Sequence, residues 1–451
     1  MHTLGLGQRN IRRREITDLI VLALLGQSTG ASNIDCQQSG ARVERLIVAA
    51  YCPTRRAVRG QERCVSAIAA HGCFRPKNEQ RHAARRVRAA LGAGPRCVLL
   101  AQSVQFLSLK FPKREQMTDL DKFLAETTAC GPIPGVSLAT LRAGTRGTEH
   151  YFGIRGSHDR SAVDAQTIFE AASLTKPVVA FIALQLAEER LLDLHQPLFD
   201  ICGDYVPGDL RSRKITAFHV LTHTSGLPNI VRDKAPLRTY FNPGERFSYG
   251  SSAFAWLQRA METVSGRLLE TLAREHVFEP LGMLHSSLEW QDRFSENYAQ
   301  GHEWEGEPVP KRRVQTAQAS WSLLTTASDY IGFVQHVLAG RDLTSASYDQ
   351  WFMPRVNTRQ GDDAEDLHGE DPPDHNVAWG LGWGLEPSES CFFHWGNNPG
   401  FRAFILANRV TKDAVVWFAN SARGMRLIHA VVPETVTGEH PSVQWLRIGR
   451  L

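Results

Sequence analysis

The chain has 451 residues, of which 42% are hydrophobic and 22% are charged, and its formal net charge is +4. This composition is ordinary for a soluble globular protein that buries one large core or two smaller ones. No apolar run reaches the roughly 18 residues that a membrane-spanning helix needs, so the sequence excludes a protein with such a helix.

The charge is divided unevenly along the chain. Residues 1–116 hold 20 Lys and Arg against 7 Asp and Glu, together with five of the eight cysteines, whereas the rest of the chain is acidic. We interpret residues 1–116 as a basic extension, disordered or without function, rather than as a nucleic-acid-binding arm, because no aromatic residues alternate with the arginines. The isolated cysteines of the body are typical of a reducing compartment, so we expect a cytoplasmic protein. Export is the alternative, because the apolar run Leu19–Leu25 has the minimum length for a signal peptide.

From residue 117 onward the patterns are those of a folded domain. The run 135–141 predicts a buried strand, and 150–154 predicts its hairpin partner across a turn at 144–147. After Ser173, apolar residues recur with helical spacing and predict a long amphipathic helix that ends near Leu191.

Helix signals dominate residues 205–330, and strand signals return toward the C-terminus. We expect helices at 218–221, 253–264 and 268–278, strands at 377–385, 391–395, 401–408 and 414–418, and a last helix at 425–432. The acidic segment 361–373 predicts a surface loop. Strands at both ends with helices between them predict an α/β (α+β) fold. In it, both chain ends form one antiparallel sheet flanked by helices, residues 205–330 are a mostly helical insert, and the site lies in the cleft between the two.

Ser173 and Lys176 form the only Ser-x-x-Lys pattern in the chain. Side chains three residues apart on a helix share a face, so a desolvated lysine can accept the proton of the serine hydroxyl. A helix N-terminus also favours the negative charge that results. The pair therefore predicts a nucleophile for acyl transfer. The competing interpretation is a helix cap beside a solvated lysine, and motifs further along the chain decide against it.

Two such motifs follow in order. Tyr249-Gly250-Ser251 comes after the turn 242–248, and His394-Trp395-Gly396 closes an apolar strand. With Ser-x-x-Lys, they resemble the serine β-lactamase and penicillin-recognising hydrolase superfamily, above all the class C β-lactamases, the D-amino-acid peptidases and the related esterases. Those proteins carry Ser-x-x-Lys, Tyr-x-Asn and Lys-Thr-Gly or His-x-Gly in this order. The resemblance implies a β-lactamase-like hydrolase domain at 117–445, beginning at Met117, behind an upstream extension at 1–116.

The resemblance also implies a role for each motif. Ser173 is the expected nucleophile, and either Lys176 or Tyr249 is the expected base. The sequence leaves this choice open, because Lys176 needs a strongly lowered pKa and Tyr249 could share a proton with it. The expected oxyanion donors are the backbone amides of Ser173 and Asn397, and we expect Gly396 to let substrate approach the strand edge.

Three positions depart from the β-lactamase pattern. Ser251 replaces the asparagine of the second motif, His394 replaces the lysine of the third, and Trp395 replaces a small hydroxyl residue. A neutral imidazole at position 394 would hold a substrate carboxylate more weakly than a lysine does. Arg402 is a candidate carboxylate anchor, with an outward-facing strand arginine as the alternative.

We therefore predict a serine hydrolase without metal or cofactor that acts through an acyl-enzyme on a small ester, amide or D-amino-acid peptide. The alternatives are a true β-lactamase or D-Ala-D-Ala carboxypeptidase, and a catalytically silent binding or scaffold protein. His219 and His223 have the spacing of a metal pair but no third ligand, so we interpret them as part of a helix capped by local hydrogen bonds. The expected partner is a small-molecule substrate and not a nucleic acid, and the sequence does not indicate an oligomeric state.

Overall fold

A computed structural model describes residues 117–130, 132–157, 160–231, 235–359 and 364–449. All of them belong to one structural unit that runs from Arg114 to Leu451. The expectations for residues 1–116, including the signal-like run, lie outside the described residues.

The secondary-structure elements alternate between the two types in the pattern that the sequence predicts. The strands are β1 (Gly135–Arg142), β2 (Thr145–Gly153), β3 (Phe169–Ala172), β4 (Leu323–Thr325), β5 (Val356–Arg359), β6 (Pro373–Trp379), β7 (Gly384–Glu386), β8 (Cys391–Asn398), β9 (Phe401–Asn408) and β10 (Ala414–Ala419). The α-helices are α6 (Asp119–Cys130), α7 (Thr175–Glu188), α8 (Leu198–Cys202), α9 (Ala217–Leu221), α10 (Ser252–Ser265), α11 (Leu269–Ala273), α12 (Ala327–Leu338), α13 (Ser345–Trp351), α14 (Ile428–Thr435) and α15 (Pro441–Trp445). Short 3-10 or π turns lie at Ser212–Lys214, Arg274–Phe278, Asp292–Glu296 and Gly424–Leu427. None of the described helices combines the length and the apolar character that crossing a membrane requires.

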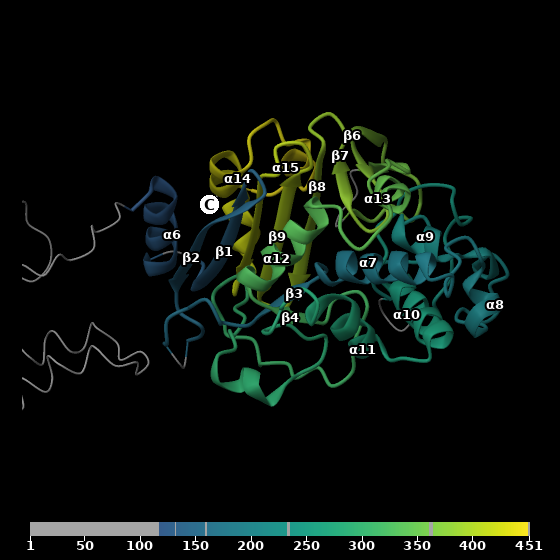
Figure 1. The fold of residues 1–451 in the computed structure, drawn as a ribbon, viewed down its shortest axis with the longest axis horizontal. Helices are drawn as coiled ribbons and strands as arrows, with labels where there is room; N and C mark the ends of the chain where they lie inside the picture. Colours follow the sequence, from purple (N-terminus) through teal and green to yellow (C-terminus); the bar gives the residue numbers. More distant parts are fainter. Residues whose placement is uncertain (1–116, 131, 158–159, 232–234, 360–363, 450–451) are drawn as a thin grey trace, which may run out of the picture. The chain divides into compact units, whose positions relative to one another are not determined.

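Both chain ends contribute to one antiparallel sheet, as predicted. Its strand order is β2-β1-β10-β9-β8-β7-β6-β5, and β1 pairs with β10 so that Leu138 lies opposite Trp417 (Figure 1). β3 and β4 form a separate small sheet. The mostly helical segment between β2 and β5 carries α7 to α13. This arrangement confirms the predicted fold class.

Two strand boundaries differ from the prediction. The expected strand 377–385 is two strands, β6 and β7, because the chain turns at Gly380–Trp383, where Gly382 has a φ of +86°. A residue with a side chain rarely adopts this left-handed conformation, so the glycine marks the turn. The first hairpin also turns at Ala143 and Gly144 rather than at 144–147, and β2 already begins at Thr145.

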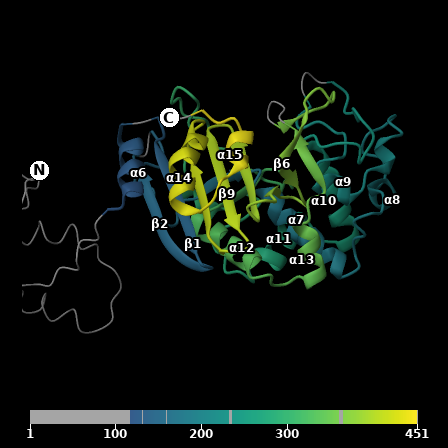
Figure 2. The same ribbon diagram turned by 90° about the horizontal axis from the view of Figure 1, so that it is seen from above.

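Helices cover both faces of the main sheet (Figure 2). On one face, α6, α14 and α15 contribute Leu124, Val431 and Trp445 to a core with strand residues such as Phe393 and Trp417. On the other face, α7 and α12 and the helices around them form the larger core. The sheet thus separates two apolar layers, and β8 and β9 contribute alternate side chains to each.

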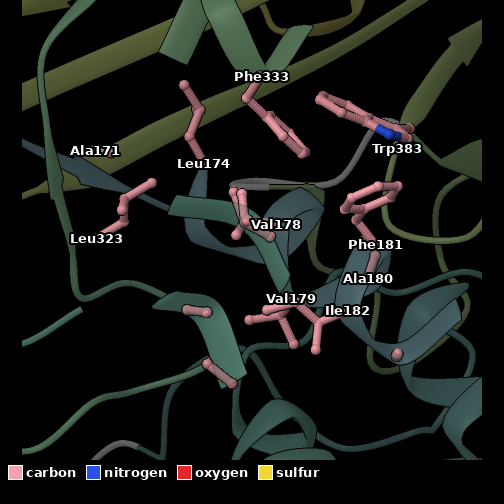
Figure 3. Close-up of a cluster of buried hydrophobic side chains, with 14 of the residues drawn as sticks. Ala171, Leu174, Val178, Val179, Ala180, Phe181, Ile182, Leu323, Phe333 and Trp383 are labelled. Carbon is pink, nitrogen blue, oxygen red and sulfur yellow. The ribbon is translucent and has the colours of Figure 1, made fainter. Parts of the chain in front are cut away.

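Helix α7 runs through the centre of the larger core. It was predicted to be amphipathic, but nearly all of it is buried, and it ends at Glu188. Val178 and Phe181 on this helix pack with Phe333 from α12 and Trp383 from the turn before β7 (Figure 3). A helix that is apolar on all sides must be surrounded by other parts of the core, as α7 is. The core therefore fixes the residues at the start of α7, among them Ser173 and Lys176.

Candidate active site

Ser173 lies in the sharp turn between β3 and α7. Ala172, directly before it, has a φ of +51°, a left-handed conformation that is unfavourable for a residue with a side chain. The Thr175 hydroxyl holds the turn: it donates to the Ala172 carbonyl at 2.6 Å and accepts from the Leu323 amide at 3.0 Å. This anchoring leaves Ser173 partly exposed, whereas its neighbours Ala172 and Leu174 are buried. A strained residue that the surrounding structure holds in place is common beside reactive groups.

Lys176 is fully buried beneath Ser173. Its Nζ lies 2.9 Å from Ser173 Oγ and 2.9 Å from the Ser320 carbonyl oxygen. It also lies 4.9 Å from the centre of the Tyr249 ring, and no carboxylate of the described residues pairs with it. Burial without a counter-charge lowers the pKa of Lys176 well below its ordinary value. A neutral amine in this position donates to the Ser320 carbonyl and presents its lone pair to the Ser173 proton.

Tyr249 lies across the site from Ser173 and is 3% exposed. Burial raises the pKa of its phenol, although the nearby Ser173 side chain opposes the shift. The hydroxyl oxygen is buried and makes no hydrogen bond of ordinary geometry with another described residue. Tyr249 is therefore a neutral phenol with a proton to donate, and not a phenolate.

His223 packs directly against Tyr249, with ring centres 4.2 Å apart. Its Nδ1 accepts a 3.0 Å hydrogen bond from the backbone N–H of Gly250, so the proton of the neutral ring is on Nε2, which is buried without a partner among the described residues. Burial lowers the pKa of His223 well below its ordinary value, and Lys176 adds to the shift whenever it is protonated. The residue also has a φ of +52°. His223 is thus a neutral ring that holds the Tyr249 loop in place through its contacts with Tyr249 and Gly250.

His219, by contrast, belongs to a helix cap. Its side chain and that of Thr216 close a reciprocal cap at the start of α9, with the Thr216 amide donating to His219 Nδ1 at 3.2 Å. This agrees with the interpretation of local hydrogen bonding, whereas His223 has the separate position beside Tyr249 described above.

Strand β8 forms the opposite wall and has a free edge. β7 pairs only with Cys391–Phe393, so from His394 onward no described strand lies on that side of β8. A Cβ on Gly396 would lie 2.4 Å from the Ala171 carbonyl oxygen. Gly396 is therefore required for β8 to approach β3, a reason different from the expected approach of substrate. This close approach brings Asn397 to the nucleophile turn.

Glu170 ties β3 to β8 and was not anticipated from the sequence. It is 4% exposed, and its carboxylate accepts from Asn398 Nδ2 at 2.7 Å and from the Tyr298 hydroxyl at 2.8 Å. Arg312 pairs with the same carboxylate. A buried carboxylate with three donors holds its neighbours in one geometry, so Glu170 fixes the strand segment that carries Asn397.

His394 is buried completely among aromatic rings. Its Nδ1 donates to the Trp395 carbonyl at 2.8 Å, and its Nε2 has no partner among the described residues. Burial lowers its pKa, and together with the effect of Lys176 in its protonated form it brings the value to about 3. His394 is thus neutral at physiological pH, and in this structure it has no surface with which to contact a substrate carboxylate. Trp395, half-buried, packs on Tyr249 at 4.8 Å between ring centres.

Ser251, the last residue of the second motif, is hydrogen-bonded to the side chain of Asn229. Its hydroxyl donates to Asn229 Oδ1 at 2.7 Å, and the Asn229 backbone amide donates to Glu365. The side-chain Nδ2 of Asn229 makes no hydrogen bond with another described residue. Ser251 replaces the asparagine of the second motif, but a side-chain amide, that of Asn229, lies next to it on a loop 22 residues earlier in the chain.

The structure brings together Ser173, Lys176, Tyr249, His394 and Gly396 from three separate segments. Arg402 lies at the far end of the β8–β9 hairpin, opposite Asn397 in register, where its Nη1 donates to the carbonyls of Asn398 and Phe401. The sequence analysis missed Glu170 and Asn229, and it assigned His223 to a capped helix, whereas α9 ends at Leu221 and His223 follows it.

Comparisons with known proteins identify the family and the fold. A family model described as Beta-lactamase matches residues 120–430. The chain is 23% identical over 332 residues to Protein flp of Staphylococcus aureus (strain N315), a match that covers 68% of this chain and 63% of flp. It is 24% identical over 347 residues to the unguisins hydrolase ungD of Aspergillus violaceofuscus, which covers 67% and 61% of the two chains. The chain thus spans less than two thirds of the length of these relatives. The fold is similar to that of a class C beta-lactamase, with a TM-score of 0.58, 19% identity, and coverage of 71% of this chain and 96% of that one.

Proposed function

The chain belongs to the Beta-lactamase family, and from this premise we propose that it is a serine hydrolase that forms an acyl-enzyme on Ser173 with a small ester, amide or D-amino-acid peptide. One observation carries the proposal: a fully buried lysine without a counter-charge lies 2.9 Å from a partly exposed serine hydroxyl. Burying an amine without a charged partner is unfavourable, so a lysine with no chemical role would be expected at the surface.

The first chemical step follows from the protonation states. Neutral Lys176 accepts the proton of Ser173 as Oγ attacks the substrate carbonyl carbon and the C–O π electrons move onto the carbonyl oxygen. The amides of Ser173 and Asn397 are the proposed donors to that oxygen. Of the two bases that the sequence leaves open, the pKa directions favour Lys176, because burial lowers the pKa of the lysine and raises that of the phenol.

Tyr249 then serves as the proposed proton relay to the leaving group. As the tetrahedral intermediate collapses, the leaving oxygen or nitrogen takes the phenol proton, and the Lys176 ammonium returns a proton to Tyr249. Water enters in place of the leaving group, gives up a proton to Lys176 and attacks the acyl carbon. As the bond from that carbon to Ser173 Oγ breaks, the Lys176 ammonium returns the proton to Oγ, which releases the acid and restores the neutral lysine. The lysine Nζ lies over the phenol ring, so both groups line one small volume.

Labelling with a fluorophosphonate tests the nucleophile. We expect the wild-type protein to be labelled and to hydrolyse short-chain p-nitrophenyl esters, Ser173→Ala to lose both properties, and Ser345→Ala, an exposed serine on α13, to keep them. Labelling that persists in Ser173→Ala assigns the chemistry to another residue. A wild-type protein that is neither labelled nor active supports the silent binding or scaffold protein instead.

A substrate comparison tests the reaction class. We expect at least about tenfold higher kcat/KM for the best ester or D-alanyl amide than for a chromogenic cephalosporin, because neutral His394 forfeits a charge-assisted contact worth roughly 1.5–3 kcal/mol. Faster opening of the cephalosporin than of every ester and amide would identify a β-lactamase.

A further inference from the structure

Glu386, Cys391 and His440 form a compact cluster of three side chains that can ligate a metal ion. Glu386 ends β7, Cys391 begins β8, and His440 directly precedes α15, elements that lie next to one another in Figure 1. A carboxylate oxygen, the thiol sulfur and a ring nitrogen of these residues all lie within 4.8 Å of one another. Glu386 and Cys391 are buried, and only 4% of the His440 side chain is exposed. This Glu–Cys–His cluster is at the opposite end of β8 from Asn397 and is separate from the site around Ser173.

A backbone carbonyl orients the ring of His440. Its Nε2 lies 3.1 Å from the Val436 carbonyl oxygen, and its Nδ1 lies 2.8 Å from the Glu386 carboxylate. Because a carbonyl oxygen only accepts, Nε2 carries a proton in either charge state of the ring. The proton on Nδ1 is the exchangeable one, and its loss leaves two lone pairs facing each other, which a cation between them would stabilise. A histidine that donates to a backbone carbonyl through one nitrogen and ligates through the other is the usual arrangement at protein metal sites.

The negative charge around the cluster exceeds what His440 can neutralise. Burial raises the pKa of the Cys391 thiol, and the carboxylates of Glu386 and Glu389 raise it further. Burial opposes protonation of His440, but the same two carboxylates raise its pKa overall. A Cβ on Gly438 would lie 2.6 Å from Glu389 Oε2 and 3.7 Å from His440 Cε1, so the Glu389 carboxylate is beside the ring. No Lys or Arg of the described residues forms an ion pair with either carboxylate. Two carboxylates therefore share one imidazolium, which leaves negative charge for a cation to neutralise.

One polar group beside the cluster has no partner. The Ser442 backbone amide donates to Glu386 at 3.0 Å, on the carboxylate oxygen that does not face His440. The Ser442 hydroxyl is fully buried and forms no hydrogen bond with another described residue. An unsatisfied buried hydroxyl is unfavourable, and a water molecule coordinated to an ion in the cluster would supply a partner. Ligand atoms, excess negative charge and an unsatisfied hydroxyl thus occur together.

We propose that the Glu–Cys–His cluster binds one divalent transition-metal ion, with Zn²⁺ as the best fit, through Glu386, Cys391 Sγ and His440 Nδ1. Glu389 or a water molecule fills the fourth position. Thiolate, imidazole and carboxylate are zinc ligands, whereas Mg²⁺ and Ca²⁺ prefer oxygen ligands alone. On binding, the S–H bond of Cys391 and the Nδ1–H bond of His440 break, both protons pass to solvent, and the sulfur and nitrogen bind the ion. The two charges of the ion then balance the thiolate and the Glu386 carboxylate.

The ion joins parts of the chain that are far apart in sequence. Glu386 and Cys391 belong to the β7–β8 hairpin, whereas His440 lies in the connection between α14 and α15. Trp445 on α15 packs on Trp395 of β8, with ring centres 5.4 Å apart, so the same connection holds α15 against the sheet. The ion is therefore structural, and the proposal does not depend on the reaction proposed for the active site.

Cobalt and zinc titrations test the site in the full chain after a chelator has removed bound metal. We expect Co²⁺ to give a thiolate-to-metal charge-transfer band in the near ultraviolet and the visible bands of a four-coordinate ion. Zn²⁺ should displace it with a Kd below about 1 μM. About two protons should be released for each Zn²⁺ that binds to the cluster. Mg²⁺ and Ca²⁺ at about a hundredfold excess should leave the cobalt bands unchanged.

Matched variants separate this site from the other cysteines and histidines of the chain. Cys391→Ser and His440→Gln should each bind about one Zn²⁺ fewer than the wild type, and Cys391→Ser should lose the corresponding charge-transfer band. Cys202→Ser removes another free cysteine of the described residues and should bind Zn²⁺ like the wild type. Glu389→Gln removes a half-buried charge and should weaken Zn²⁺ binding at least about threefold.

Urea unfolding measures the structural role of the ion. The wild-type and Cys202→Ser midpoints should rise when Zn²⁺ is added to the chelator-treated protein, and the Glu389→Gln midpoint should rise less. A wild type without the thiolate band, or with the same Zn²⁺ stoichiometry as Cys391→Ser, overturns the proposal and leaves Glu386 and His440 as an ion pair. Where the ligand variants do not fold, equal Zn²⁺ affinities of Glu389→Gln and the wild type overturn it. A wild-type midpoint that does not respond to Zn²⁺ contradicts the structural role.

Discussion

Replacing Tyr249 with phenylalanine should lower activity and leave stability unchanged or increased. The substitution removes one oxygen and keeps the ring that packs on His223 and lies beneath Lys176. That oxygen is buried without a hydrogen-bond partner of ordinary geometry, and burying an unsatisfied polar group costs about 1–3 kcal/mol. We therefore expect the free energy of unfolding of Tyr249→Phe to equal or exceed that of the wild type. At the same time kcat for a D-alanyl amide, whose amine leaving group must be protonated, should fall by about 10²–10⁴-fold, because a general acid is lost.

Tyr330→Phe is the matched control for this experiment. Tyr330 is also buried, but its hydroxyl donates to the Leu174 carbonyl at 3.0 Å. Removing it leaves a buried acceptor unpaired, so the free energy of unfolding should fall by about 1–3 kcal/mol. Urea unfolding followed by tryptophan fluorescence measures both variants, alongside initial rates of amide hydrolysis. A Tyr249→Phe protein that is destabilised as much as Tyr330→Phe and keeps its full rate would refute the assignment of Tyr249 as the proton relay.

Three further predictions concern the surroundings of the site. Burial opposes protonation of His440, but the hydrogen bond and charge of Glu386 at 2.8 Å raise its pKa overall. Protonated His440 therefore stabilises the fold fully below the ordinary histidine pKa of about 6.5, and this stabilisation is lost as pH rises through the raised value. With a chelator present, the urea midpoint of the wild type should decline across that range, and the midpoint of His440→Gln should not show this decline. His223→Asn keeps a side-chain acceptor for the Gly250 amide and tolerates the left-handed backbone, whereas His223→Leu does neither. We therefore expect kcat to fall more in the leucine variant, with a changed pH–rate profile. Equal rates in the two variants would exclude a positioning role for His223. Gly396→Ala forces a Cβ to 2.4 Å from a backbone oxygen, so it should destabilise the protein by about 1–3 kcal/mol and reduce kcat, and an unchanged urea midpoint would contradict the close approach of β8 to β3.

The parts of the site that the sequence predicted are those that local spacing determines. Ser173 lies in the turn before α7 and Lys176 in the first turn of that helix, three residues later, so their proximity follows from local geometry. The antiparallel sheet was predictable because its strands are short apolar runs with turn-forming residues between them. The split between β6 and β7 was not, because residues 377–385 are apolar throughout and only the left-handed backbone at Gly382 interrupts them.

The parts that were missed depend on contacts between distant segments. His223 accepts a hydrogen bond from the backbone amide of Gly250, 27 residues away, and the Glu170 carboxylate accepts one from Asn398, 228 residues away. No periodicity in the sequence encodes such pairs. The burial of His394 likewise depends on Trp379 and Trp383 from another strand and turn, with ring centres 5.5 and 6.5 Å away. A sequence pattern can therefore name the residue in a motif without indicating whether it faces solvent.

The alternation of side chains along β8 gives the two faces of one strand different environments. His394 and Asn398 face β3 and α7, where burial keeps Lys176 free of its proton. Trp395 and Asn397 lie on the other side of the strand, where Trp395 packs on Trp445 from α15. The free edge of β8 from His394 onward therefore lies between a buried face that carries the nucleophile and a more open face lined by Trp395 and Asn397.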